Sequence, residues 1–165
     1  MGRIDLRELA ARESEQVEWK RQVASVSDVL ETITAFANDF QNLGGGYVVC
    51  GAEEQKDQYG FQKVEYIGLD ANKFKEIEGK VMADARLKIE PEVLPLIEEL
   101  PTSSPDRRVL VFIVPATGHA HSYRASGSDA SKYYVRIGRS TIEARNGVLR
   151  ELLVRRQALP PWDRR

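Results

Sequence analysis

The sequence is poor in cysteine and in long apolar segments. Its one cysteine, Cys50, stands in the apolar run YVVCG, where a buried and unreactive thiol is expected. Such cysteine usage fits a reducing, cytoplasmic compartment. No stretch approaches the ~20 apolar residues that cross a bilayer, and the N-terminal region holds no apolar core of signal-peptide length. We therefore expect neither export nor membrane insertion.

A strongly basic charge and a nucleotide-binding signature are also missing. The net charge is −1, which argues against a nucleic-acid binder that depends on bulk positive charge. The glycines of GGGY follow a predicted helix and lack the lysine and the Ser/Thr of a P-loop, and no other Walker motif occurs. ATP binding by this chain is therefore not supported.

The charges that are present are unevenly distributed. Residues 121–165 contain ten Lys and Arg against four Asp and Glu, whereas residues 1–120 contain 14 against 21. Two explanations fit this asymmetry. The basic part lines a groove for a polyanion, or the last helix presents Arg150, Arg155 and Arg156 as a solvated face.

The length of 165 residues and the 42% hydrophobic content fit one domain with its own core. Apolar periodicity and turn residues predict an α/β (α+β) fold, a mixed β-sheet with about three helices. The first expected elements, in chain order, are a strand at 17–21, a helix at 28–42 ended by Gly44, a strand within GGGYVVCGAEE, an exposed loop QKDQYG and a weak strand at 61–67. They are followed by a helix capped at 70 or 72 and running through 85, a hairpin of EVLPLIEELP with RRVLVFIVP, a loop at 116–131, the strand KYYVRIG, and a last helix entered directly from a turn at 138–141.

The stretch ESEQVEWKRQ is unusually rich in charge around one tryptophan. If it forms a strand, its side chains alternate between two faces, so Val17 and Trp19 point one way while Glu18 and Lys20 point the other. A carboxylate beside an ammonium suits a divalent metal next to a phosphate. It equally suits an ordinary surface salt bridge worth about 0–1 kcal/mol.

Three landmarks in order, the E-S-x-x-x-E-W-K run, AFAN with GGGYVVCGAEE, and YYVRIGRST, resemble the Schlafen AlbA-type domain. This domain occurs in Schlafen proteins and at the N-terminus of prokaryotic RecG-like and divergent-AAA transcriptional regulators. The resemblance implies an Alba-related, Schlafen-core-like fold over residues 1–157 and the binding of DNA or RNA. It also implies that residues 158–165 begin a linker to a C-terminal region.

Some Schlafen proteins are metal-dependent ribonucleases with three acidic residues, and the resemblance carries these onto particular positions. Two fall on Glu13 and Glu18, and the third falls on Glu53 or Glu54, of which we take Glu54. The family more often has aspartate at this third position, and glutamate reaches one bond further. In this hypothesis the three carboxylates bind Mg²⁺ or Mn²⁺ and Lys20 supplies a cation, whereas nucleic-acid binding alone requires no cofactor.

The most credible nucleic-acid surface combines an aromatic ring that stacks on a base with cations that bind phosphate. The alternative is that Tyr134 is partly buried and that the arginines pair with the acidic first part of the chain. The residues predicted to bind nucleic acid are Lys20, Arg21, Lys132, Tyr134, Arg136 and Arg139.

The residue patterns together with the resemblance to the Schlafen AlbA-type domain imply a cytoplasmic nucleic-acid-binding domain of a transcriptional regulator or RecG-like protein. The first alternative is a Schlafen-type endoribonuclease that cleaves tRNA or other RNA. The second is an oligomerisation module, because Alba-like folds often pair, so a homodimer is expected there. No membrane partner is expected.

Overall fold

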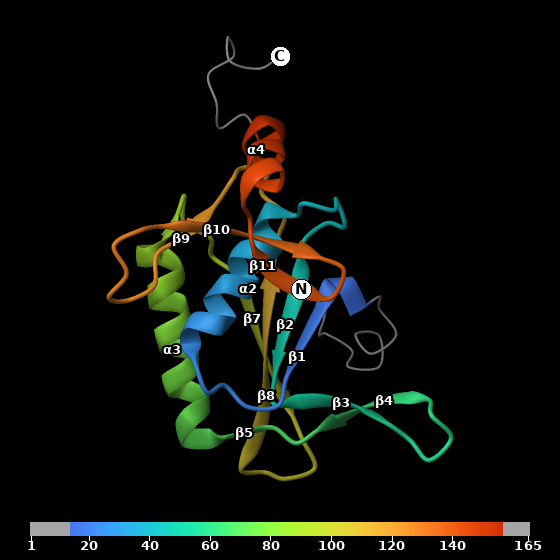
Figure 1. Ribbon diagram of the computed structural model, residues 1–165. Helices are drawn as coiled ribbons and strands as arrows, with labels where there is room; N and C mark the ends of the chain where they lie inside the picture. The colour runs from blue at the N-terminus through green and yellow to red at the C-terminus, as the bar shows by residue number, and fades with distance from the viewer. Residues whose placement is uncertain (1–13, 157–165) are drawn as a thin grey trace.

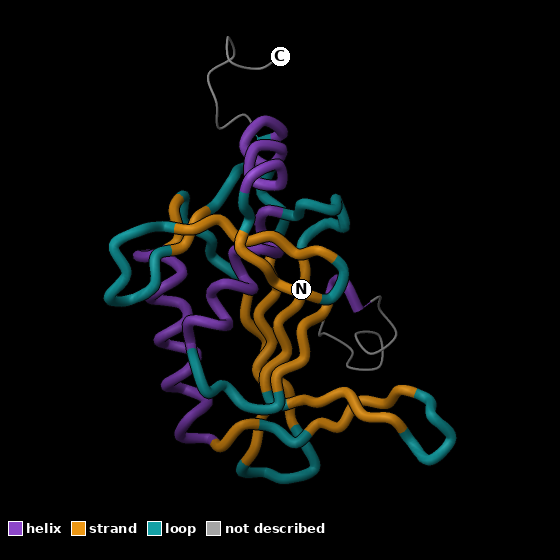
Figure 2. Tube along the Cα trace, viewed as in Figure 1, coloured by secondary structure: helices purple, strands orange, loops and turns teal. Residues whose placement is uncertain are grey.

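The computed structural model describes residues 14–156, so the proposed linker at 158–165 lies outside the described residues. Within them the chain forms three α-helices, a short 3-10 turn at Ser14–Gln16 and three β-sheets. Figure 2 shows where the helices, strands and loops lie along the chain. The expected α+β class with about three helices is therefore confirmed.

The main sheet is mixed, as expected, and its register fixes which residues share a face. Trp19 lies beside Val49 and Glu18 beside Val48, so Val17 and Trp19 face one side and Glu18 and Lys20 face the other. The edge strand and the buried strand predicted around SSPD do form a hairpin. The sheet comprises β1 (Val17–Lys20), parallel to β2 (Gly46–Cys50), then β8 (Arg107–Val114), which pairs antiparallel with β2, β5 (Leu69–Asp70) and β7 (Leu96–Pro101).

Two helices, α2 (Val26–Asn38) and α3 (Ala71–Lys88), cover one face of this sheet (Figure 1). The apolar residues of α2 recur every three or four positions, which places them on the side that meets the sheet. Leu30, Ile33 and Phe36 are buried against Val48 and Phe112. The helix layer therefore buries the sheet face that also carries Glu18 and Lys20.

Helix α2 ends four residues earlier than its apolar pattern predicts. Asp39 adopts a left-handed conformation, with φ of 45°. Its carboxylate accepts hydrogen bonds from the backbone N–H groups of Leu43 and Gly44, at 2.8 and 3.0 Å. This local capping competes with continued helix, so Phe40 lies beyond the helix although it fits the period.

A second sheet joins β6 (Ile89–Glu90), β9 (Ser122–Tyr123), β10 (Lys132–Ile137) and β11 (Ser140–Glu143), and helix α4 (Asn146–Arg155) follows it. Strand β11 differs from the expectation that the turn at 138–141 leads directly into the last helix. Ile137 pairs with Ser140 across a two-residue turn in which Gly138 has φ of 60°. Glycine tolerates this conformation, so the chain forms a tight hairpin before the helix.

A two-stranded ribbon of β3 (Ala52–Lys56) and β4 (Gln62–Tyr66) projects from the end of the main sheet (Figure 1). Strand β4 corresponds to the weak strand expected at 61–67. At the ribbon root, backbone packs against backbone: a Cβ on Gly51 would lie 2.8 Å from the Cα of Gly68. Trp19 packs edge-on against Tyr66, with ring centroids 6.5 Å apart, and so joins the ribbon to β1.

The side chain of Asn38, at the end of α2, connects the two main parts of the molecule. Its amide group donates to the carbonyl oxygens of His121 and Tyr134, at 3.0 and 2.7 Å. Its own carbonyl accepts from the N–H of His121 at 2.6 Å. Asn38 is completely buried, so water does not compete for these hydrogen bonds. They fix the second sheet relative to the helix layer.

The solvated arginine face, one explanation of the basic C-terminal part, forms only in part: Arg150 and Arg155 of α4 are exposed, whereas Arg156 is half-buried. Arg156 donates to the backbone carbonyls of Asn38 and Asp39 at 2.8 and 2.9 Å. Arg155 donates to the carbonyl of Phe40 at 2.7 Å. Cations at the C-terminus of a helix satisfy its free carbonyls and its dipole, so Arg156 supports the end of α2, while Arg155 holds the segment that follows the helix.

No helix among residues 14–156 has the length and apolarity that crossing a lipid bilayer requires.

Substitution of Asn38 should destabilise the fold strongly. Asn38→Ala removes three buried hydrogen bonds, so we expect a loss of about 2–4 kcal/mol in the free energy of unfolding. Urea denaturation followed by circular dichroism measures it. Asn72→Ala makes the same change at an exposed position of α3 and should shift the value by less than about 0.5 kcal/mol. Equal effects of both variants would contradict the role assigned to Asn38.

Candidate functional site

Most of the charged residues singled out from the sequence meet in one groove. It consists of two adjoining hollows of about 440 and 350 Å³ that share Glu18 and Arg139. It lies where β1, the ribbon root and the β10–β11 turn come together. We call this space the groove, and its lining comprises Val17, Glu18, Trp19, Lys20, Arg21, Asp28, Glu31, Thr32, Glu53, Glu54, Arg136, Arg139, Ser140 and Thr141.

Glu18 and Arg136 form the innermost ion pair of the groove. The Nη2 of Arg136 lies 2.8 Å from the Oε2 of Glu18, and its Nη1 donates to the Oγ1 of Thr141 at 3.0 Å. The guanidinium also stacks over Phe36, 5.0 Å from the ring centroid. Only 5% of the Arg136 side chain is exposed. This arrangement corresponds to the alternative interpretation, in which an arginine of β10 pairs with the acidic first part of the chain.

Arg139 and Arg21 occupy the rim of the groove and are more accessible. Arg139, in the β10–β11 turn, forms an ion pair with Glu54, and 54% of its side chain is exposed. The Nη1 of Arg21 lies 3.2 Å from the Oε2 of Glu53. Both cations therefore face solvent and are held by single, partly exposed carboxylates.

Lys20 lies deeper, with its Nζ 4.0 Å from the Oε1 of Glu18. It follows Glu18 on the same face of β1, as the alternation predicts. The contact is longer than the bond from Arg136, so Arg136 is the principal partner of Glu18. Lys20 places a second positive charge beside the same carboxylate.

Tyr134 and Lys132 lie outside the groove lining. Tyr134 is half-buried against the helix layer, with its ring 6.5 Å from that of Tyr123. Burial, followed by the charge of Glu31, raises the pKa of Tyr134 to about 12. The Nζ of Lys132 lies 3.7 Å from a carboxylate oxygen of Glu143. The half-burial of Tyr134 again matches the alternative interpretation, because base stacking requires an open ring face.

Glu31 is a groove residue that sequence reasoning missed. Burial and the nearby charge of Asp28 raise the pKa of its carboxyl group, while a hydrogen bond from Tyr134 opposes the shift. Asp28 and Glu31 stand one turn apart on α2, on the side opposite its apolar stripe. That spacing of two acids on a helix that packs against a sheet was the signal available in the sequence.

The nuclease hypothesis requires three carboxylates, and the structure describes two of them. Glu18 and Glu54 line the same hollow, but Glu13 lies outside the described residues. Among residues 14–156, no group of three His, Cys, Asp or Glu side chains is placed to hold a metal ion. These residues therefore do not form a metal centre by themselves, and a Mg²⁺ or Mn²⁺ site stays a prediction.

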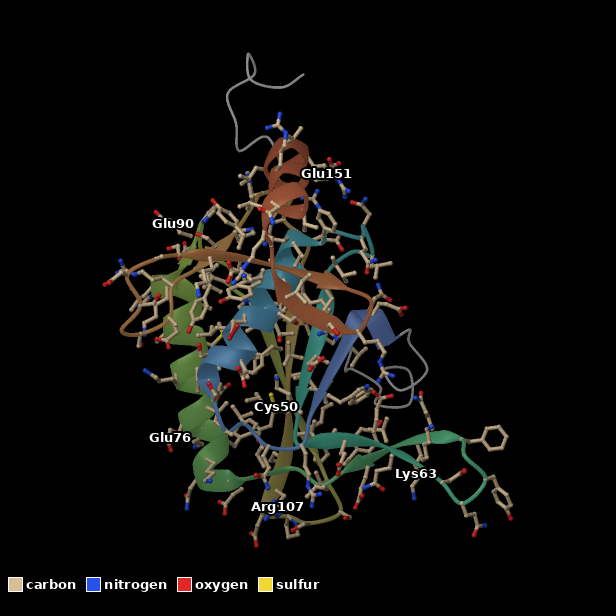
Figure 3. The ribbon with its side chains drawn as sticks, in the orientation of Figure 1. Cys50, Lys63, Glu76, Glu90, Arg107 and Glu151 are labelled. Carbon is tan, nitrogen blue, oxygen red and sulfur yellow. The ribbon has the colours of Figure 1, made fainter. Side chains whose placement is uncertain are left out.

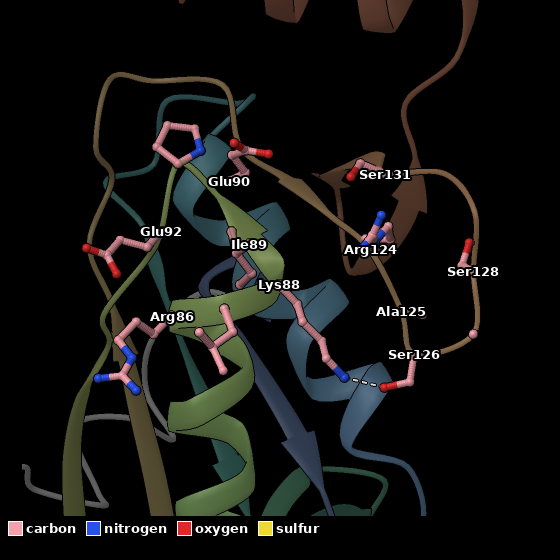
Figure 4. A pocket seen from close by; sticks show the side chains of 13 residues that line it. Arg86, Lys88, Ile89, Glu90, Glu92, Arg124, Ala125, Ser126, Ser128 and Ser131 are labelled. Atoms are coloured by element: carbon pink, nitrogen blue, oxygen red, sulfur yellow. Dashed lines mark hydrogen bonds between the residues drawn. The ribbon is translucent and has the colours of Figure 1, made fainter.

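Another cavity, of about 790 Å³ and larger than either hollow of the groove, lies between the end of α3 and the loop at 124–131 (Figure 4). Its lining is polar, and Lys88 is already engaged by Ser126 and by Asp84, whose carboxylate lies 3.6 Å away. None of the residues predicted from the sequence to bind nucleic acid or metal lines this cavity. We therefore assign the candidate site to the groove.

Comparison with known proteins finds a matching family and similar solved structures. A family model described as Schlafen, AlbA_2 matches residues 13–145. The solution NMR structure of the N-terminal domain of an ATP-dependent DNA helicase RecG-related protein from Nitrosomonas europaea is 26% identical, covers 82% of this chain and 87% of its own, and has a TM-score of 0.56. A crystal structure from Corynebacterium diphtheriae is 18% identical over 78% of this chain and 22% of that protein, with a TM-score of 0.49. No curated protein matches the chain.

The buried ion pair of Arg136 and the exposed ion pair of Arg139 should contribute differently to the free energy of unfolding. Glu18→Gln leaves the buried guanidinium of Arg136 without its counter-charge and should cost about 1–3 kcal/mol of unfolding free energy. Glu54→Gln breaks the exposed pair with Arg139 and should cost less than about 1 kcal/mol. Chemical denaturation of both variants, which make the same isosteric change, tests this order. The reverse order would contradict the burial assigned to Arg136.

Proposed function

The chain belongs to the Schlafen AlbA_2 family, and on this basis we propose that it is a nucleic-acid-binding domain whose groove receives a phosphate backbone. The observation that carries the proposal is the exposure of Arg139 and its single ion pair. Its guanidinium stands at the rim of the groove, more than half exposed, with Glu54 as its ion-pair partner. A guanidinium in this position is suited to bidentate binding of a phosphate.

Exchange of partners at Arg139 is energetically easy. An exposed ion pair contributes about 0–1 kcal/mol, so a phosphate can replace Glu54 with little loss. Arg21 has the same arrangement with Glu53. Both arginines line one hollow, so a single strand passing through it can contact both.

Arg136 has a different part in this proposal. It is buried and bonded to Glu18 and Thr141, so it positions the β10–β11 hairpin against β1 instead of contacting the ligand. Arg139 follows it by three residues, in the turn of that hairpin. The buried pair therefore sets where the exposed arginine stands.

The charge balance of the groove predicts moderate affinity. Four cations, Lys20, Arg21, Arg136 and Arg139, face five carboxylates, those of Glu18, Asp28, Glu31, Glu53 and Glu54. Few phosphates can be neutralised there, so we expect two or three contacts at most. The logarithm of the binding constant should fall with the logarithm of salt concentration with a slope of about −2.

A narrower role, as a module of a RecG-like protein or transcriptional regulator, rests on the name of the similar Nitrosomonas protein. We propose it as the context in which the groove acts. It would place the domain beside DNA or RNA that another part of such a protein processes.

A second function, metal-dependent cleavage of RNA, is favoured by one observation. Glu18 and Glu54, two of the three acids matched to Schlafen ribonucleases, line the same hollow. Glu13 would have to complete the set. Carboxylate oxygens are the ligands that Mg²⁺ and Mn²⁺ prefer, and a bound ion would supply an activated water and charge stabilisation at the phosphate.

Substitution of Arg139 should weaken binding without affecting the fold. Arg139→Ala is expected to lower the affinity for labelled single-stranded RNA or DNA about 3- to 30-fold and to reduce the salt slope by about 1. Fluorescence anisotropy over a series of salt concentrations measures both. Arg108→Ala removes an exposed arginine that pairs with Glu99 away from the groove and is the matched control. If wild-type protein binds no nucleic acid at low salt, the proposed function is wrong.

The nuclease alternative predicts a metal-dependent product. Incubation of labelled tRNA with Mn²⁺ should give cleavage that EDTA abolishes and that Glu18→Gln lowers by about 100-fold or more. Gel electrophoresis resolves the products. Glu65→Gln changes an exposed acid of the β3–β4 ribbon that does not line the groove, and this variant should cleave as wild type does. RNA that stays intact under all conditions would leave binding as the function and exclude this alternative.

A further inference from the structure

The ribbon ends in two aromatic rings that nothing in the described part of the molecule covers. Tyr59 is 76% exposed and Phe61 is 71% exposed. Exposing a large apolar ring is unfavourable, and two such rings on a projecting tip commonly indicate a binding surface. Figure 3 shows how far the ribbon, marked by Lys63, extends from the core around Cys50.

The tip is a built structure. The carboxylate of Asp57 accepts hydrogen bonds from the backbone N–H groups of Tyr59 and Phe61, both at 2.9 Å. The N–H of Asp57 donates to the carbonyl of Phe61 at 2.8 Å, and Gly60 donates to the carbonyl of Asp57 at 3.0 Å. These bonds hold the backbone of both aromatic residues in one turn, so their exposure is imposed by the fold.

The charges around the rings suit a polyanion. Lys56 and Lys63 flank the tip on neighbouring strands and are both exposed. The carboxylate of Asp57, the nearest acid, is engaged by backbone N–H groups, and the other ribbon acids lie toward its root. Gln58 and Gln62 add exposed amide groups. The rings can stack on the faces of unpaired bases, and the ammonium groups can bind phosphates. The amides can form hydrogen bonds with the base edges.

The ribbon also leads directly from the groove. Glu54, the partner of Arg139, and Lys56 lie on the same face of β3, two residues apart. The tip begins at Asp57, three residues beyond Glu54 and therefore about 10 Å from it along the ribbon. A few nucleotides of an extended strand can span this distance. A strand whose phosphates contact Arg139 can therefore reach the rings without bending back.

We propose that Tyr59 and Phe61 stack on unpaired bases, so that the domain prefers single-stranded over duplex nucleic acid. This inference rests on the proposed function, because it adds a base-contacting element to the phosphate-contacting groove. A paired base has both faces covered by its neighbours, so the rings gain stacking only with a single strand. Two isolated rings surrounded by polar side chains present far less area than the ~800 Å² that each partner buries in a stable protein interface.

The test compares one labelled single strand with a blunt duplex of the same sequence. Tyr59→Ser combined with Phe61→Ser should lower single-strand affinity at least about tenfold and duplex affinity less than about twofold. Tyr59→Trp combined with Phe61→Trp should retain single-strand preference, because tryptophan also stacks. Circular dichroism and thermal unfolding of the serine variant should match wild type, since both side chains are exposed.

Separate outcomes distinguish the tip from the groove. Unchanged single-strand affinity of the serine variant, or equal loss for strand and duplex, overturns the stacking proposal while the groove stands. Loss of a dimer by light scattering with unchanged affinity assigns the tip to a second copy of the chain and also overturns it. If Arg139→Ala has no effect but the serine variant loses strand binding, the groove is wrong and the tip is supported. Wild-type protein that binds neither probe refutes both.

Discussion

The buried carboxamide of Asn38 is the contact on which the arrangement of the site depends. It joins the end of α2 to backbone groups that precede β9 and lie within β10. Carboxamides suit this position because one side chain both donates and accepts, so it can satisfy peptide groups of either kind in a place that water does not reach. Helix α4 reinforces the same point from the other side, through Arg156 and the last carbonyls of α2. The groove lies where the second sheet, held in place by these contacts, meets β1 and the ribbon root.

Burial divides the arginines of the groove into two populations. Arg136 is surrounded by Glu18, Thr141 and the ring of Phe36, so its charge is committed to structure. Arg139 and Arg21 carry the same guanidinium but stand in solvent, where an ion pair has little net value. Glu31, which has a raised pKa because it is buried near Asp28, is a third case, an acid for which ionisation is costly. Side chains of the same residue type thus differ in how readily they can bind a ligand, because they differ in exposure to solvent.

The sequence was sufficient for the features that a repeating pattern determines. The apolar period of α2, the apolar run of β8 and the alternation along β1 all predicted the observed elements, and three ordered motifs predicted the family. Features determined by single contacts were not predictable. The stop of α2 depends on the carboxylate of Asp39, and β11 has only Ile142 as an apolar residue, too few for an alternating pattern. The burial of Arg136 depends on Phe36, a hundred residues earlier in the chain, which no local pattern reveals. Glu13 falls outside the described residues, so its part in the site stays a prediction.

The close backbone packing of Gly51 against Gly68 fixes the root of the ribbon. The length of the ribbon therefore sets how far its tip lies from the groove. Each residue added to a strand advances the tip by about 3.3 Å and turns the side chains to the opposite face. Insertion of one residue in each strand would therefore carry the terminal side chains to the wrong side, whereas insertion of two in each would lengthen the ribbon with its faces unchanged. The distance between groove and tip can therefore change without reversing the faces of the ribbon only in steps of two residues per strand.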